Sequence, residues 1–338
     1  MRFQLTDDQK ALKAGVRDLL SGRFGAGELR AAVARPGVLD RALWRELGAA
    51  GFFALRLPEA EGGVGLGLPE AVLAFEEAGR VLLPGPLVAT HLAAGRVAGA
   101  ATGEAVVTAV CPGGLVEWLE AADTVLGDAS GAAPLTSVDP LTPLHRLPPV
   151  PPGSVYGAGT ASAPGTASGV PTPHGSAPAP GVARARVGDT PGVSGGGTAD
   201  PVGVLLTAAE QLGGAARVCE AAVAYARTRE QFGRPIGAFQ AVKHLCAQSL
   251  VRVETARVAV YAAAVTADPL DIAAARLLAD EAAVRGARDC LQVHGGMGFT
   301  WESDVHLFLK RAWVRTQRTG ESTHSEELLA AELLTEAG

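Results

Sequence analysis

Two short segments concentrate side chains whose chemistry suits a binding site. Residues 227–240 read Arg-Thr-Arg-Glu-Gln-Phe-Gly-Arg-Pro-Ile-Gly-Ala-Phe-Gln, and residues 292–299 read Gln-Val-His-Gly-Gly-Met-Gly-Phe. An arginine guanidinium is a planar fork that can contact two phosphate oxygens at once, although Arg229 could equally form a surface ion pair with Glu230. The pair Gly295-Gly296 could let a ligand approach closely, or it could simply end a helix.

Other reactive side chains in the sequence point to packing rather than to catalysis or metal binding. His294 lies between an expected helix end and a glycine turn, and we expect it to pack or to cap the helix more than to shuttle protons. The four cysteines are far apart, with no CxxC pair and no spacing typical of zinc ligands. We therefore expect buried thiols in a reducing cytosol and no metal site.

Long helices are expected to position the two segments, one at each helix end. Residues 201–338 contain apolar positions at helical spacing over about 204–229, 239–267, 271–293 and 303–316. The second of these helices should bury Val242, Leu245, Cys246, Leu250, Val253 and Val260. Residues 323–326, Thr-His-Ser-Glu, have the pattern of a capping box that opens a last helix. Antiparallel helices joined by short turns predict an up-and-down bundle.

Residues 1–101 predict a separate helical domain. Residues 6–9, Thr-Asp-Asp-Gln, form a capping box, and Leu12, Val16, Leu19 and Leu20 follow on one helix face. Further helices are expected over residues 40–47 and from Pro69 to Pro84, separated by a glycine-dense loop over residues 57–67.

Residues 102–200 predict a small β region with an unusual insertion. Short strands are expected over residues 105–110, 124–126 and 182–187. From Pro148 to Asp200, 22 of the 53 residues are Gly or Pro. The part over about 148–181 contains too little aliphatic mass to repay its ordering entropy, so we expect a flexible segment there.

Composition excludes several classes of protein. The 338 residues carry a formal net charge of −6, with no basic run that would indicate nucleic-acid binding. No apolar run reaches the roughly 18 residues of a membrane span, and the N-terminus is polar from its start, unlike a signal peptide. These features favour a cytoplasmic protein without nucleic-acid or membrane partners.

The two segments, taken together, resemble the signature of the acyl-CoA dehydrogenase family. Residues 58–63, Pro-Glu-Ala-Glu-Gly-Gly, are similar to the family's PE-x-x-GG turn, so the resemblance covers residues 1–100 and 201–338. It implies a mainly α fold, in which a helical N-terminal domain and a C-terminal four-helix bundle flank a middle β region, reduced here. It also implies a substrate cleft between these three units.

The resemblance implies that FAD, held mainly by a neighbouring subunit, contacts this chain through both segments. By that likeness Arg229 would bind the pyrophosphate, Phe232 would pack on the flavin nucleotide and Gln240 would hydrogen-bond to it. Gln292, Gly295 and Gly296 would form the turn approached by the adenine end.

The sequence departs from the family where the catalytic base is usually found. The usual glutamate before a glycine corresponds to Thr319, and the alternative position at the start of a long helix corresponds to Gly203. Neither residue is a carboxylate that could abstract a proton α to a thioester. Glu321 could serve only if its loop were shifted. The family's threonine-rich strand and its Gly-x-Lys-x-Trp/Phe-Ile turn also have no match in residues 102–200.

These departures favour a subunit that depends on a partner for catalysis. The hypothesis is a base-less chain paired with a related full-length subunit, two copies of each (α2β2), as in steroid side-chain dehydrogenases, with the acyl-CoA bound mainly by the partner. One alternative is a self-sufficient dehydrogenase that uses Glu321. Another is a scaffold homologue that binds no flavin.

Overall fold

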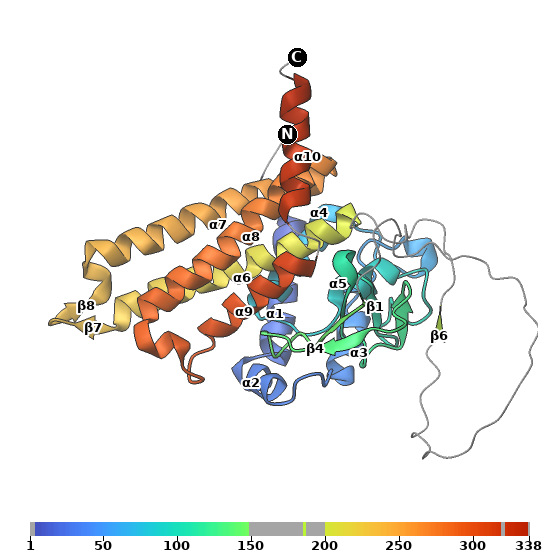
Figure 1. Ribbon diagram of the computed structural model, residues 1–338, viewed down its shortest axis with the longest axis horizontal. Coiled ribbons are helices and arrows are strands. Elements are labelled where there is room, and N and C mark those ends of the chain that lie inside the picture. The colour runs from blue at the N-terminus through green and yellow to red at the C-terminus, as the bar shows by residue number, and fades with distance from the viewer. Residues whose placement is uncertain (1–3, 149–184, 187–199, 319–321, 337–338) are drawn as a thin grey trace, which may run out of the picture.

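The computed structural model describes residues 4–148, 185–186, 200–318 and 322–336 (Figure 1). Residues 149–181 of the predicted flexible segment, together with Thr319 and Glu321, lie outside these ranges. In Figure 1 the long helices form an elongated bundle, and the N-terminal helices and short strands pack against one end of it.

The N-terminal unit contains the expected helices and two that the sequence did not reveal. Its helices are α1 (Asp7–Arg23), α2 (Ala26–Ala34), α3 (Arg41–Ala49), α4 (Leu68–Arg80) and α5 (Leu87–Ala93), with a 3-10 turn η1 (Glu59–Glu61) in the glycine-dense loop. The capping box of α1 is confirmed. The Thr6 hydroxyl accepts from the Gln9 amide at 3.2 Å, and the Gln9 side chain accepts from the Thr6 amide at 3.0 Å. Helix α4 ends at Arg80, before the expected Pro84, and Leu82 takes a left-handed φ of 57°.

The C-terminal unit is the predicted bundle. Its helices are α6 (Pro201–Thr228), α7 (Gln240–Thr266), α8 (Pro269–His294), α9 (Val305–Arg318) and α10 (Ser322–Glu336). Helix α10 begins at Ser322, so Thr323 lies in its first turn and is not its N-cap, contrary to expectation. The prediction for Leu250 was also wrong: this side chain is 52% exposed, because it lies on the outer face of α7.

Helices α4 and α6 approach each other at glycines, which fixes the N-terminal unit on the bundle. A Cβ at Gly79 would lie 2.0 Å from the Glu210 carbonyl oxygen, and a Cβ at Gly213 would lie 1.9 Å from that of Glu76. Only glycine can occupy such positions without moving the backbones apart. The main apolar core runs continuously through this crossing, from α1 and α4 to α6, α7 and α8.

The described part of the middle region has more strands than the sequence predicted, each of two or three residues. β1 (Val107–Ala109), β3 (Thr124–Leu126) and β6 (Ala185–Arg186) form a parallel sheet in the order β1-β3-β6, with Val107 opposite Thr124. β2 (Leu115–Glu117), β4 (Ala133–Leu135) and β5 (Leu144–Arg146) form an antiparallel sheet that was not expected. A 3-10 turn, η2 (Pro112–Gly114), precedes β2.

The described part of the chain has no helix long and apolar enough to cross a bilayer. Within the same residues, no three His, Cys, Asp or Glu side chains gather as they would around a metal ion. All four cysteines are free thiols; Cys219 and Cys290 are buried, whereas Cys111 and Cys246 are partly exposed, against the expectation of burial.

Candidate functional site

The two segments singled out in the sequence lie at the same end of the bundle (Figure 1). The first contains β7 (Glu230–Gln231), β8 (Arg234–Pro235) and the 3-10 turn η3 (Ile236–Ala238), which join α6 to α7. The second contains the end of α8 and the 3-10 turn η4 (Gly295–Phe299). An apolar cluster of residues from α6, α7, α8 and α9 holds the two segments together.

Arg229 is exposed and forms no ion pair with any described residue. It follows the last residue of α6, and its backbone N–H donates to the Tyr225 carbonyl at 2.9 Å. The ion pair with Glu230 that the sequence left open does not form among the described contacts. The guanidinium group therefore remains available to an anionic ligand.

Phe232 stands at the tip of the β7–β8 hairpin and is 91% exposed. Phe232 and Gly233 both have positive φ angles, 54° and 75°, as a two-residue type I′ turn requires. A phenylalanine in this conformation is strained, and such strain is concentrated at functional sites. The Phe232 ring meets the Phe239 ring edge-on at 6.0 Å, and the Arg234 guanidinium lies 4.4 Å from the centre of the Phe239 ring.

The remaining predicted residues line the same end of the bundle. Gln240 is the first residue of α7, Gln292 lies in the last turn of α8, and both are exposed. Gly295 has a φ of 61° and a ψ of −143°, which favours glycine. A Cβ added at Gly295 or Gly296 would meet no atom of this chain within 4 Å, so the chain's own packing does not exclude a side chain there.

His294 packs, as expected, and its partner is a residue that the sequence did not reveal. Its ring stacks on Tyr225 with 4.1 Å between centroids and 21° between planes. Its Nδ1 lies 2.8 Å from the Cys290 carbonyl oxygen. The signal that could have found Tyr225 is its place one helical turn before Arg229 in the same segment.

Of the two positions where the resemblance places a catalytic base, the structure describes only Gly203. It is buried in the first turn of α6, and a Cβ there would lie 3.3 Å from Leu92 and 3.6 Å from Val88. The Leu92 contact is tight, so this side chain would have to shift slightly to admit a Cβ. This position therefore has no carboxylate.

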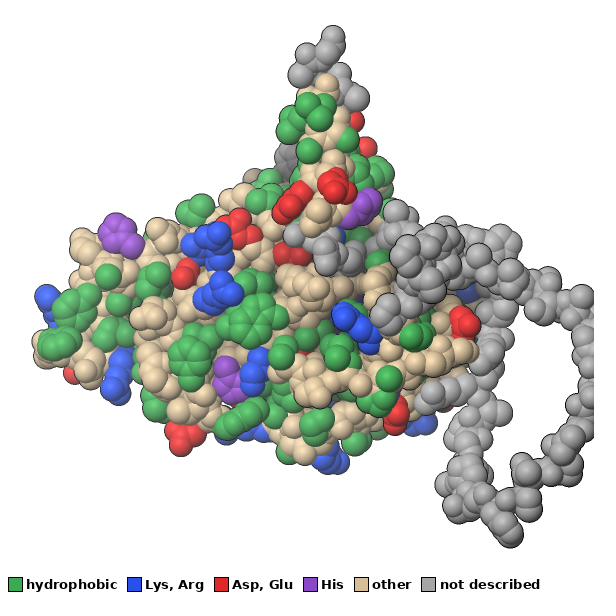
Figure 2. Space-filling model, viewed as in Figure 1, with side chains coloured by type: hydrophobic (Ala, Val, Ile, Leu, Met, Phe, Trp, Pro, Cys, Tyr) green, Lys and Arg blue, Asp and Glu red, His purple; other side chains and the backbone are tan. Residues whose placement is uncertain are grey.

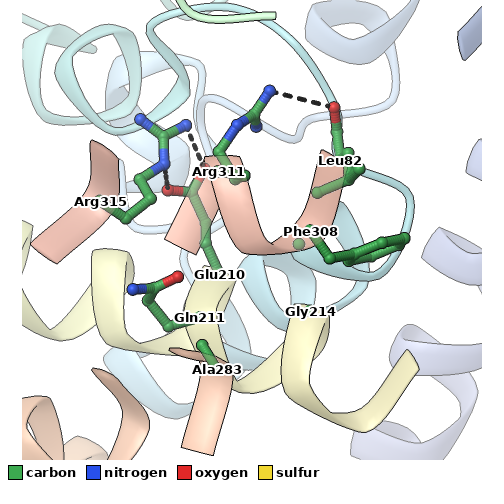
Figure 3. A pocket seen from close by; sticks show the side chains of 9 residues that line it. Leu82, Glu210, Gln211, Gly214, Ala283, Phe308, Arg311 and Arg315 are labelled. Atoms are coloured by element: carbon green, nitrogen blue, oxygen red, sulfur yellow. Dashed lines mark hydrogen bonds and ion pairs between the residues drawn. The ribbon is translucent and has the colours of Figure 1, made fainter. Parts of the chain in front are cut away.

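A buried ionic cluster, not anticipated from the sequence, joins α9 to α6 and β2. Arg315 donates to both carboxylate oxygens of Glu117, at 2.8 and 2.9 Å. Its Nε lies 3.1 Å from Glu210 (Figure 3). Arg318 lies 3.8 Å from Glu117 and 3.6 Å from Glu210. Burial alone would raise the pKa of Glu117, but the guanidinium groups of Arg315 and Arg318 outweigh it and hold this pKa below its usual range.

Arg311 extends the cluster to the N-terminal unit. Its Nε lies 2.5 Å from the Asp139 carboxylate, and its Nη atoms donate to the carbonyls of Leu82, Leu83 and Leu141. These contacts join the bundle, the N-terminal unit and the middle region at one place. The available sequence signal was the spacing of Arg311, Arg315 and Arg318, which repeats every three or four residues like a buried helix face.

The cavity at this junction has room for about one water molecule. It measures about 10 Å³ and is lined by Glu210, Gln211, Phe308, Arg311 and Arg315, among others (Figure 3). A wider groove of about 450 Å³ lies between α6 and α7, with Val223, Arg227 and Leu250 on its walls. Neither space matches a substrate cleft between the three units. The first is far too small for an acyl-CoA thioester, and the second lies between two helices of the bundle.

Comparisons with known proteins agree with this arrangement of units. The family model "Acyl-CoA dehydrogenase, N-terminal domain" matches residues 6–105, and "Acyl-CoA dehydrogenase, C-terminal domain" matches residues 202–334. The acyl-CoA dehydrogenase IpdE2 of Mycobacterium tuberculosis is 34% identical over 90% of this chain and 91% of its own length. This chain is an acyl-CoA dehydrogenase family member.

Two solved structures illustrate the fold that this chain shares with known proteins. A chain of the ChsE4-ChsE5 complex from Mycobacterium tuberculosis superposes with a TM-score of 0.76 at 24% identity, covering 99% of both chains. A chain of the Tcur3481-Tcur3483 steroid acyl-CoA dehydrogenase gives a TM-score of 0.74 at 24% identity, covering 98% of this chain and 99% of that one. The acyl-CoA dehydrogenase fold is therefore retained here, with short strands in the described part of its middle region.

Proposed function

We propose that this chain is the base-less subunit of a hetero-oligomeric acyl-CoA dehydrogenase, which contributes FAD-binding residues to a catalytic partner subunit. The observation that carries the proposal is the end of the bundle, where Arg229 is exposed and unpaired among the described contacts beside the strained, exposed Phe232. A binding surface that its own chain leaves uncovered is suited to a group held by another subunit.

The residues at this end fit a dinucleotide cofactor. Arg229 would hold the pyrophosphate, Phe232 would pack on the flavin nucleotide, and Gln240 would donate a hydrogen bond to it. Gln292, Gly295 and Gly296 would form the turn beside the adenine end, where the open space around both glycines supports a close approach. When bound, FAD would supply the acceptor for the hydride that leaves the β carbon of an acyl-CoA thioester.

The junction of the three units supports the lack of an independent active site. Proton abstraction α to a thioester needs a carboxylate within reach, and Gly203 offers none. The carboxylates of Glu117 and Glu210 are buried and engaged by Arg315. The cavity beside them measures only about 10 Å³. Typical ligand pockets are far larger, at roughly 300 Å³ or more.

The proposed partner is a related full-length subunit, in an α2β2 assembly that binds the acyl-CoA mainly through that partner. The ChsE4-ChsE5 structure is a complex of two named chains, and the Tcur3481-Tcur3483 structure is named a steroid acyl-CoA dehydrogenase. By analogy we extend to this chain both a hetero-oligomeric assembly and an acyl-CoA thioester, steroid side chains included, as its substrate class.

The test is the flavin content of the chain purified alone and after co-expression with candidate partner subunits. We expect a colourless chain alone and a yellow complex with fewer FAD molecules than subunits. Arg229→Ala should remove most of the flavin from the complex. Arg227→Ala, which removes an exposed arginine from the last turn of α6, should not. A yellow homotetramer that oxidises acyl-CoA without a partner would refute the proposal.

The two alternatives give different results in the same assay. A self-sufficient dehydrogenase would lose its activity on Glu321→Gln while keeping its flavin. A scaffold that binds no flavin would give complexes whose flavin content does not change on Arg229→Ala.

A further inference from the structure

A group of large apolar side chains is exposed along η4 and α9, beside the proposed cofactor turn. The exposed fractions are 70% for Phe299, 66% for Trp301, 46% for Met297 and 40% for Trp313. The chain has four tryptophans, and the other two, Trp44 and Trp118, are at most 2% exposed. We refer to one set of these side chains, together with a neighbouring lysine, as the aromatic face: Phe299, Trp301, Trp313 and Lys310. Figure 2 shows hydrophobic side chains gathered over α9 on this side of the molecule.

The aromatic face has a defined geometry. The Trp301 ring meets the His306 ring edge-on at 4.8 Å, and the Lys310 Nζ lies 4.6 Å from the centre of the Trp301 ring. His306, Lys310 and Trp313 follow one another at four- and three-residue spacing, which places them on one side of α9. Trp301 is therefore held against this helix, with a cation over its ring.

The segment that carries Phe299 and Trp301 is fixed by its own hydrogen bonds. The Thr300 hydroxyl donates to the Met297 carbonyl at 2.9 Å, and the Ser303 amide donates to the Thr300 carbonyl at 3.1 Å. From a different unit, Arg30 donates to the Glu302 carbonyl at 3.1 Å. The exposure of these rings thus belongs to an anchored segment, and large apolar side chains exposed close together in this way are typical of interaction sites.

We propose that the aromatic face is a main docking surface for the catalytic partner subunit. This inference rests on the proposed function. The catalytic subunit is the expected partner because Phe299 belongs to the same 3-10 turn as Gly295 and Gly296. A subunit that brings FAD to these glycines would therefore also reach Phe299. Aromatic side chains dominate the binding energy of protein interfaces. We expect the partner to place a carboxylate near Lys310 and an apolar recess around Trp301.

The test measures assembly of the tagged full-length chain with the co-expressed partner subunit. Phe299→Ser and Trp301→Ser should each weaken association about tenfold or more, as the loss of a central aromatic contact does. Lys310→Glu, which keeps the aromatic rings, should weaken it less and in a salt-dependent way. The matched control is Val38→Ser, on the loop between α2 and α3, where the side chain is 58% exposed. Equal thermal unfolding of the lone variants would confirm that each still folds.

A second measurement does not depend on variants. Hydroxyl-radical labelling of Trp301 and Met297 should fall several-fold in the complex relative to the lone chain, while labelling of Val38 should not change. Wild-type association of the Trp301→Ser variant with its flavin retained, together with no protection of Trp301 in the unsubstituted complex, would overturn this inference and leave the proposed function intact. A homodimer of this chain that protects Trp301 without a partner would overturn it as well. If the unsubstituted chain forms no flavin-containing complex, both the proposed function and this inference are wrong.

Discussion

The imidazole ring of His294 stacks on the phenol ring of Tyr225, with 4.1 Å between the ring centroids and 21° between their planes. The contact joins the ends of α6 and α8, which carry Arg229 and Gly295 respectively. Neither ring is among the residues that the proposed function assigns to contacts with the cofactor. Their stacking instead fixes the distance between the two segments that the proposed function assigns to one cofactor.

Tyr225→Ala should therefore loosen the site without removing any cofactor-contacting residue. We expect several-fold lower flavin retention in the co-purified complex. The Tyr225 ring is half-buried. Its removal should therefore also cost the lone chain about 2 kcal/mol in the free energy of unfolding. Visible absorbance of the complex and urea unfolding of the chain measure the two effects.

The conservative variant Tyr225→Phe is the control for this prediction. It keeps the stacked ring and should restore both flavin retention and stability. Unchanged flavin in Tyr225→Ala would show that the stack does not position the site.

The hairpin tip offers a substitution with opposite effects on stability and binding. Phe232→Asn creates an Asn-Gly pair, which is the preferred sequence of a type I′ turn and tolerates positive φ. The lone chain should become more stable by about 1 kcal/mol. The complex should lose flavin, because the exposed aromatic ring is gone. Calorimetry of the lone chain and absorbance of the complex test this pair of outcomes; a gain in both would argue that Phe232 has no binding role.

The sequence predicts the long helices well and the short elements poorly. Helices α6, α7 and α8 have 28, 27 and 26 residues. Their apolar spacing therefore repeats many times, and their ends were expected to within a few residues. Helices α2 and α5 have nine and seven residues and were missed. Strands β2, β4 and β5 have three residues each, too few to show alternation, and their pairing depends on contacts distant in the chain.

The functional residues also divide into those that the sequence predicts and those that only the packing reveals. Arg229, Phe232, Gln292 and the glycine pair stand in recognisable motifs, so the family resemblance was enough to predict that they share one site. Glu117, Glu210 and Arg315 come from three separate elements, and each alone looks like an ordinary surface charge. Only the packing of β2, α6 and α9 shows that these charges meet in the interior.

Removal of Arg315 should destabilise the protein strongly. The substitution Arg315→Met would leave the buried carboxylates of Glu117 and Glu210 without their main partner, at a cost of about 3–5 kcal/mol in the free energy of unfolding. Urea unfolding measures the loss.

Arg285→Met provides the control for this prediction. Arg285 and Glu281 form an ion pair at 3.1 Å with both side chains largely exposed. The loss of such a surface pair should cost less than about 1 kcal/mol. If the two substitutions lower the free energy of unfolding equally, the buried cluster does not stabilise the protein more than a surface ion pair does.

His91 should make the chain sensitive to mild acid. Burial lowers the pKa of His91 to about 4, although its contact with the Phe52 carbonyl opposes the shift, and the ring packs edge-on against Phe75 at 5.3 Å. The unfolded chain, with a histidine pKa near 6.5, binds this proton between about pH 6.5 and 4 while the folded chain does not. Stability from neutral His91 is thus complete above about pH 6.5 and falls as pH decreases, by up to about 3 kcal/mol at pH 4.

Comparison with His91→Gln isolates this contribution, because every other titrating group is shared. Among these, the largely buried Asp280 has a pKa raised to about 6 by desolvation, so its own effect on stability has the opposite sign over part of this range. The difference in unfolding free energy between the native chain and His91→Gln should shrink steadily from about pH 7 to pH 4.5. A difference that stays constant across this range would mean that His91 is protonated in the folded protein as readily as in the unfolded chain.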